Sequence, residues 1–178
     1  MTRSRVIVLA LVTACLLSGR VPDRPLGAGP DLSSASADVA GDIVRRLDQL
    51  NPHLTDPQLE RIRAAIQRYS AKYSLDPLLV TAVIEVESAA RPWARSPAGA
   101  LGLMQVMPYM INPMGLAGNP STIETNIEAG CMILADNIRR LGESDGISAY
   151  FWGSDIRGVT YLNRVRAARD RLQGEIQS

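Results

Sequence analysis

Apolar residues recur every three or four positions along most of this chain, the spacing that places side chains on one face of an α-helix. The first such stripe consists of Val39, Ile43, Leu47 and Leu50. Asn51-Pro52 then interrupts the pattern, because proline cannot continue a helix. The spacing therefore predicts a helix from about residue 38 to residue 50.

Two further helices begin with the same signal, a polar capping residue followed by proline in the first turn. Thr55-Asp56-Pro57 opens one of them, and Asp76-Pro77 opens the next, which extends to about Ser88. The apolar stripe of the former consists of Leu59, Ile62, Ile66, Tyr69 and Tyr73. We therefore expect helices at about 56–73 and 77–88.

The second half of the chain contains two more stripes. Thr125 and Glu128 have the spacing of a capping box. The stripe that follows consists of Ile127, Cys131, Leu134, Ile138 and Leu141, and the last consists of Tyr161, Val165, Ala168 and Leu172. The last segment also carries five arginines, which predict a solvated face or, alternatively, a contact with anionic envelope polymers. No segment shows the alternation of a strand, so residues 38–178 are expected to form one all-α domain.

The first 37 residues have a different character. Two arginines within Met1–Arg5 precede the apolar run Val6–Leu17, which is too short to span a bilayer but is typical of a secretory signal. We therefore expect a signal peptide within residues 1–19 and an exported, periplasmic or outer-membrane protein. Val12-Thr13-Ala14-Cys15 resembles a lipobox, so lipid anchoring at Cys15 and plain secretion are both open. Residues 20–37, rich in Pro, Gly and Ser, are predicted to be a flexible linker.

Composition narrows the chemistry. The 178 residues carry a net charge of +1, a single His and two cysteines, which excludes a multi-histidine metal centre and the common four-cysteine zinc sites. Nothing requires a metal or an organic cofactor, and the near-neutral charge argues against a nucleic-acid partner. Because Cys15 is acylated or removed under either interpretation, Cys131 is predicted to be a buried, unpaired thiol.

Two glutamates on the 77–88 helix are expected to differ. Glu87 continues the apolar stripe of Val80, Val83 and Ile84, whereas Glu85 is turned about 200° away and is predicted to face solvent. Desolvation would raise the pKa of Glu87 and keep it protonated, as a general acid requires. The alternative is a carboxyl at the rim of the core that reaches water.

The loop that follows the helix carries a second group of features. Gly99 and Gly102 would allow positive φ or close backbone approach, and Gln105 offers a donor and an acceptor among apolar neighbours. Taken together, Glu87-Ser88, Ser96, the run 99–105 (GALGLMQ) and Met107-Pro108 closely resemble the signature of the soluble lytic transglycosylase catalytic domain. Residues 126–130 (NIEAG) and Ala149-Tyr150 are similar to its later motifs, so the resemblance extends over about residues 59–172.

The resemblance implies a lysozyme-like fold with a groove for the N-acetylglucosamine and N-acetylmuramic acid strand of peptidoglycan. It implies that Glu87 is the sole catalytic acid and that Ser96, Gln105 and Met107 contact the sugar, with Tyr150 beside the carboxylate. Ser96 as a turn cap and Met107 as a core residue are the structural alternatives. If the Tyr150 hydroxyl is buried, its expected partner is Glu87.

One departure from the family pattern concerns the third motif. The family usually continues it as Tyr-Asn-Ala-Gly, whereas Tyr150 is followed here by Phe151-Trp152-Gly153. This replacement removes an amide from the site. The two aromatic residues are expected either to stack on a sugar or to pack in the core.

The predicted function is therefore that of a peptidoglycan lytic transglycosylase that forms 1,6-anhydromuramic acid ends, with an envelope or secretion-machinery protein as a further partner. Two alternatives remain. A muramidase of the same fold would need a second carboxylate such as Asp155. A glycan-binding scaffold would fit the altered third motif, although the presence of Glu87 argues against it.

Overall fold

The structure, a computed structural model, describes residues 32–176 of the chain. Its α-helices are α1 (Leu32–Leu50), α2 (Asp56–Tyr73), α3 (Pro77–Ser88), α4 (Ile123–Leu141), α5 (Glu143–Trp152) and α6 (Thr160–Ile176), and a short 3-10 helix, η1, spans Pro108–Met110. Over this range there is no strand, only isolated bridges between loop residues near 95, 101 and 106. The predicted all-α class is confirmed. The predicted signal peptide, Cys15 and residues 20–31 lie outside the described part.

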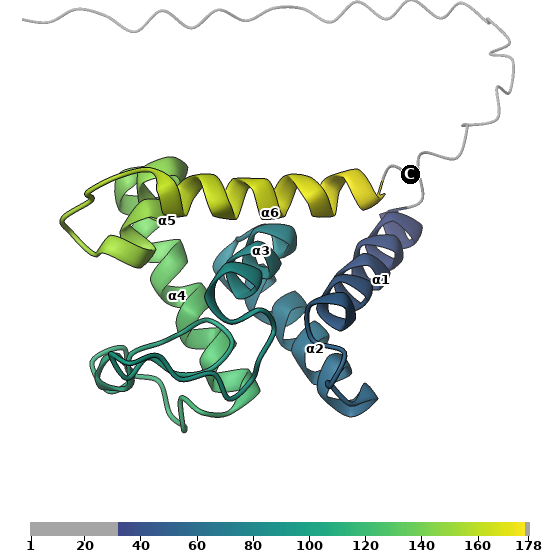
Figure 1. The fold of residues 1–178 in the computed structure, drawn as a ribbon, viewed down its shortest axis with the longest axis horizontal. Helices are drawn as coiled ribbons and strands as arrows, with labels where there is room; N and C mark the ends of the chain where they lie inside the picture. Colours follow the sequence, from purple (N-terminus) through teal and green to yellow (C-terminus); the bar gives the residue numbers. More distant parts are fainter. Residues whose placement is uncertain (1–31, 177–178) are drawn as a thin grey trace, which may run out of the picture. The chain divides into compact units, whose positions relative to one another are not determined.

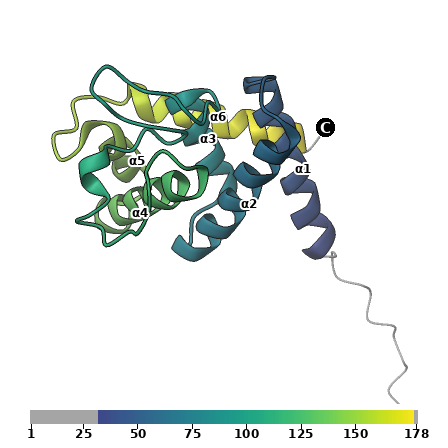
Figure 2. The ribbon, with the colours of Figure 1, turned by 90° about the horizontal axis from the view of Figure 1, so that it is seen from below.

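α3 is the central helix of this arrangement. Every residue from Leu78 to Ile84 is buried, as expected for a helix that is apolar on all sides. α6 and α2 pack against it, and α1 adds a smaller contact (Figures 1 and 2). Asp76 caps its first turn by accepting a hydrogen bond from the Leu78 backbone at 2.9 Å, so the predicted start is confirmed. The C-terminal turn of this fixed helix carries Glu87.

α1 begins six residues earlier than the sequence pattern predicted. The helix starts at Leu32, so the end of the expected linker at residue 37 is wrong. The stretch from residue 32 to 37 lacks glycine and proline and consists of leucine, serine and alanine, which tolerate a helix even without an apolar stripe. Periodicity could not detect this turn because it contributes no recurring apolar position.

Two features of the C-terminal half also differ from expectation. Thr122, rather than Thr125, is the N-cap of α4, so the predicted capping box is wrong. α5 was not predicted as a separate element, because it is short and contains Gly146. That glycine is required by packing: a Cβ there would lie 2.6 Å from the backbone of Ile138 on α4. The two helices therefore approach too closely for any side chain at this position.

The arginines of the last segment are not a uniformly solvated face. Arg169 pairs with Asp76 at 2.6 Å and with Glu143 at 3.1 Å, so it joins α6 to the starts of α3 and α5. Arg171 pairs with Glu85. The buried thiol predicted at Cys131 is confirmed, and desolvation raises its pKa. None of the helices in residues 32–176 is both long and apolar enough to cross a membrane.

Candidate active site

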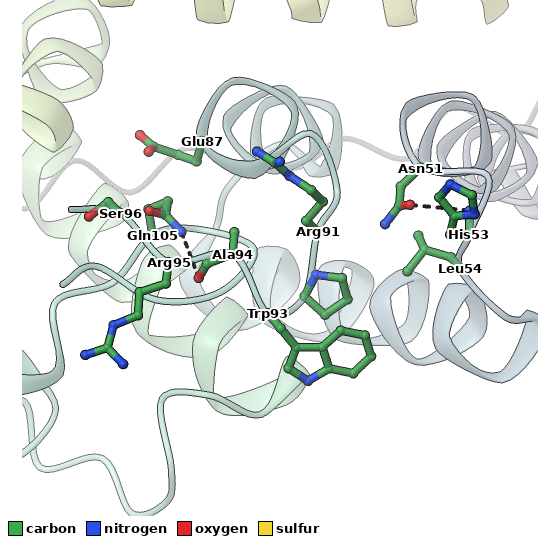
Figure 3. A pocket seen from close by; sticks show the side chains of 11 residues that line it. Asn51, His53, Leu54, Glu87, Arg91, Trp93, Ala94, Arg95, Ser96 and Gln105 are labelled. Atoms are coloured by element: carbon green, nitrogen blue, oxygen red, sulfur yellow. Dashed lines mark hydrogen bonds between the residues drawn. The ribbon is translucent and has the colours of Figure 1, made fainter. Parts of the chain in front are cut away.

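A cleft of about 580 Å³ opens beside the C-terminal end of α3. It is lined by Asn51, His53, Leu54, Glu87, Arg91, Pro92, Trp93, Ala94, Arg95, Ser96 and Gln105. Figure 3 shows Glu87, Ser96 and Gln105 at one end and Asn51, His53 and Leu54 at the other. The cleft therefore brings together the first two sequence motifs, the segment between them, and the turn between α1 and α2.

Two glycines shape the loop on which the site depends. Gly99 and Gly102 have φ values of +91° and +75°, so the predicted positive φ is confirmed at both positions. A Cβ on Gly102 would lie 2.5 Å from the amide of Asn126. That buried amide accepts a hydrogen bond from the Met104 backbone and donates one to the Leu101 carbonyl, both at 2.8 Å. Asn126 thereby fixes the loop against α4.

Glu87 is a half-buried carboxyl at the end of α3. Burial raises its pKa above the ordinary value, while a hydrogen bond from Tyr161 and the charge of Arg164 act in the opposite direction. The net shift is upward, because neither opposing contact offsets the desolvation of the charged form. The direction of the shift agrees with the expectation for a general acid.

The phenol that contacts Glu87 is Tyr161. Its hydroxyl donates to Glu87 Oε1 at 2.6 Å, whereas the Tyr150 hydroxyl donates to the Met104 carbonyl at 2.8 Å. The expected bond between Tyr150 and Glu87 is therefore wrong. Burial, with the neighbouring charge of Glu87, raises the pKa of both tyrosines, so both phenols remain neutral donors. Tyr161 belongs to an apolar stripe in the sequence. Its hydroxyl, a polar group within that stripe, could have suggested that it contacts a polar partner.

Glu85 does not face solvent, so that prediction is wrong. Arg46 on α1 donates to both of its carboxylate oxygens, at 2.9 and 2.8 Å, and Arg171 on α6 donates to Oε1 at 2.6 Å. Although burial raises its pKa, the hydrogen bonds from the two arginines outweigh this, and the pKa of Glu85 is lowered. Helical geometry correctly predicted that Glu85 points away from Glu87. The side of α3 that carries Glu85 is covered by α1 and α6, however, and not by solvent.

Of the four other predicted site residues, two line the cleft. Ser96 lines it and also stabilises a turn, because its Oγ accepts a hydrogen bond from the Ala100 backbone at 3.0 Å. Gln105 lines it with a left-handed φ of +49°, a costly conformation for a residue with a side chain. Its amide nitrogen donates to the Gly102 and Ala94 carbonyls. Met107, half-buried before η1, and Tyr150 are not among the lining residues.

The two aromatic residues of the altered third motif, Phe151 and Trp152, differ in exposure and in packing. Phe151 is 56% exposed and stacks on Tyr161, with ring centroids 5.1 Å apart and an interplanar angle of 16°. Trp152 is half-buried and packs edge-on against Phe151. Phe151 therefore covers the phenol that bonds Glu87, an arrangement that neither expected role of this pair described.

Sequence reasoning missed part of the cleft lining. Arg91, Trp93 and Arg95 lie between the two recognised motifs, and His53 belongs to the turn after α1. The sequence did offer one indication of their role, because a tryptophan and two arginines lie in the short connection between Glu87-Ser88 and Ser96. Their convergence with the α1–α2 turn depends on tertiary packing.

With this geometry established, the chain can be placed in a family. It matches the family described as "Transglycosylase SLT domain" over residues 64–165, more than half of its length. The chain belongs to this family. The resemblance stated from the motifs is confirmed.

Individual relatives match over shorter portions. The chain is 38% identical over 87 residues to a protein named transglycosylase from Enterobacteria phage PRD1, covering 48% of this chain and 32% of that one. It is 34% identical over 97 residues to a membrane-bound lytic murein transglycosylase C from Photorhabdus laumondii, covering 49% and 27%. The chain thus spans a third or less of these relatives. The 70 kDa soluble lytic transglycosylase of Escherichia coli is similar at a TM-score of 0.49 and 24% identity, covering 80% of this chain and 25% of that one.

Proposed function

We propose that this protein is a peptidoglycan lytic transglycosylase in which Glu87 acts as the single general acid and then as the base. One observation carries the proposal: Glu87, with its raised pKa, is the only carboxylate among the residues that line the cleft. A cleft with one acid suits a reaction in which the substrate supplies its own nucleophile. Membership of the transglycosylase SLT domain family supports the same activity.

The proposed reaction uses one carboxyl twice, first to donate a proton and then to accept a different one. Protonated Glu87 donates to the glycosidic oxygen between N-acetylmuramic acid and N-acetylglucosamine, and the bond from that oxygen to C1 breaks as the glucosamine leaves as an alcohol. The acetamido oxygen of the muramoyl sugar stabilises the positive charge at C1. Ionised Glu87 then removes the proton of the C6 hydroxyl, and O6 bonds to C1 to give the 1,6-anhydro sugar. The protonated carboxyl is thereby restored.

Neutral donors around Glu87 suit both steps. Tyr161 keeps one hydrogen bond on the carboxyl, which holds its position and moderates the rise in its pKa. We assign sugar contacts to Ser96 and to the Oε1 of Gln105, which face the same cleft. Met107 and Tyr150 are not among the residues that line the cleft, and the Tyr150 hydroxyl donates to the Met104 carbonyl instead.

The hydrolytic alternative has less support. A muramidase with two carboxylates needs the second one roughly 5–10 Å from the acid. Asp155, the residue considered for this role, is an exposed side chain paired with Arg157 at 2.6 Å and does not line the cleft. We therefore favour the anhydro product over the hydrolytic one.

The proposed setting is the bacterial envelope. The secretory signal predicted within residues 1–19 would export the domain, and acylation at Cys15 would anchor it to a membrane. A relative named as membrane-bound is compatible with that choice. An envelope or secretion-machinery partner remains part of the proposal.

The decisive experiment is mass spectrometry of the soluble products that the protein releases from purified sacculi. We expect muropeptides lighter by one water than hydrolytic products, and a loss of turnover of about 10²–10⁴-fold in Glu87→Gln, the range for removal of a general acid. Glu60→Gln, an exposed glutamate on α2 paired with Arg63, is the matched control and should retain activity. Products at the hydrolytic mass, or near-normal activity in Glu87→Gln with the fold intact, would refute the assignment.

A further inference from the structure

The cleft continues from Glu87 along an exposed basic edge. This edge, called here the arginine rim, consists of Arg91 and Arg95 with Trp93 between them. The two arginines are exposed, and the Trp93 side chain is 69% exposed. In Figure 3, Arg91 and Trp93 occupy the middle of the cleft and Arg95 lies below Ser96 and Gln105. The rim therefore borders the path that a strand would follow away from the catalytic acid.

The backbone of the rim is held firmly. Ala89 and Ala90 adopt left-handed φ values of +49° and +56°, which alanine tolerates only where its surroundings impose them. Asn51 donates from its amide to the Ala90 carbonyl at 3.0 Å. The Ala94 carbonyl accepts a hydrogen bond from the Gly102 backbone at 2.8 Å. The rim is thus fixed to the α1–α2 turn on one side and to the glycine loop on the other.

The charges of the rim are uncompensated. Arg91 donates through Nε to the Ser88 carbonyl at 2.8 Å, which orients its guanidinium and leaves the terminal nitrogens available. Within the described residues, neither Arg91 nor Arg95 forms an ion pair. Most arginines elsewhere in this part of the chain do pair with carboxylates: Arg45, Arg46, Arg61, Arg63, Arg139, Arg140, Arg157, Arg169 and Arg171.

This contrast points to a ligand. Two unpaired guanidiniums in one cleft, that of Arg91 being oriented by the Ser88 carbonyl, match carboxylates, to which arginine donates two parallel hydrogen bonds. An exposed indole between them offers an apolar face to a sugar ring. When Glu87 is protonated, no negative charge remains among the lining residues to balance the rim.

We propose that the arginine rim binds carboxylate groups carried by the glycan strand and so selects anionic, peptide-bearing strands over neutral ones. The proposal rests on the proposed function, which places the strand in this cleft. Two sources share this chemistry: the free carboxyls of the attached peptide and, on muramoyl sugars that carry no peptide, the carboxyl of the lactyl ether.

Binding is to be measured in the Glu87→Gln protein, so that turnover does not consume the ligand. Three probes are compared: a neutral chitin hexasaccharide, glycan strands stripped of peptide by an amidase, in which the lactyl carboxyl is freed from its amide bond, and intact peptide-bearing strands. The rim variants are Arg91→Gln, Arg95→Gln and the double variant. Arg68→Gln is the matched control, because Arg68 is an exposed arginine outside the cleft that stacks on Tyr69.

For intact strands we expect each rim variant to raise Kd about three- to tenfold, the range for partly solvated ion pairs, with a larger increase in the double variant. Arg68→Gln should leave Kd unchanged, and Arg91→Lys should recover part of the loss. Chitin binding should be the same in all variants. In intact strands the lactyl carboxyl is bound in an amide, so a loss seen on them is assigned to the peptide carboxyls. A loss that also appears on stripped strands shows that the rim accepts the freed lactyl carboxyl as well.

Equal losses on chitin and on intact strands, losses equal to those of Arg68→Gln, or absence of binding to every probe would overturn the proposal. The proposed activity is judged separately, by the mass of the products that the wild-type protein releases from sacculi. Charge-selective binding without anhydro products would reject the proposed activity but support carboxylate binding by the rim. Anhydro products with unchanged binding in the double variant would reject only the proposal that the rim binds carboxylates.

Discussion

Glu85 and Glu87 stand two residues apart on α3, yet their surroundings send their pKa values in opposite directions. Burial raises the pKa of both carboxyls. For Glu85 two arginines reverse the effect, whereas for Glu87 a neutral phenol and the charge of Arg164 do not. Burial alone therefore does not set the direction of the pKa shift. That direction depends on whether cations bond directly to the carboxylate, as two arginines do at Glu85.

The two sides of α3 also differ in what they contact. On one side, Glu85 joins α1 and α6 to the central helix through Arg46 and Arg171. On the other, Glu87 lines the cleft, and burial raises its pKa. The ion-pair side fixes the rotation of the helix, and this rotation directs Glu87 into the cleft.

The largest effect that tests this comparison is on stability. Glu85→Gln should lower the free energy of unfolding by about 2–3 kcal/mol, because it removes the half-buried carboxylate to which both Arg46 and Arg171 donate. Chemical denaturation monitored by circular dichroism measures the change. Glu60→Gln, which breaks an exposed pair within α2, should change little. Equal stabilities of the two variants would show that the Glu85 cluster does not hold α3.

A smaller effect concerns the pH dependence of activity. The hydrogen bond from Tyr161 lowers the pKa of Glu87, so Tyr161→Phe should raise this pKa further. Because the acid must be protonated to act, the alkaline fall in activity should move to higher pH. The measurement is the rate of product release against pH, with Tyr150→Phe as the control, since its hydroxyl bonds the Met104 carbonyl instead. An unmoved alkaline limb, or the same shift in both variants, would contradict the role given to Tyr161.

The smallest effect is on the pH dependence of stability. The lowered pKa of Glu85 stabilises the fold above its unfolded-state value, and this contribution is lost as pH falls through the folded value. The raised pKa of Glu87 has the opposite sign, so its contribution is present at low pH and is lost as pH rises through the folded value.

Denaturation at several pH values should therefore show opposite changes in slope for Glu85→Gln and Glu87→Gln. The former should weaken the loss of stability at acid pH, and the latter should weaken the loss on going toward neutral pH. Slopes that change in the same direction would break the comparison.

Local signals in the sequence were sufficient for several features. Asp76-Pro77 set the start of α3, and the apolar stripes set the cores of α2, α4 and α6. Gly99 and Gly102 adopt the positive φ that their positions predicted, because only glycine takes that conformation without strain. The order of the motifs was enough to indicate the family, since it depends on residue identity and spacing alone.

Tertiary structure decided the rest. Helical spacing could place Glu85 opposite Glu87, but it could not supply α1 and α6, which come from 39 and 86 residues away to cover it. Likewise, a stripe position could not tell which of Tyr150 and Tyr161 would reach the carboxyl. Periodicity records which face of a helix is apolar. Which groups pack against that face, and therefore the charge and solvation of each carboxyl, is fixed only when distant segments meet.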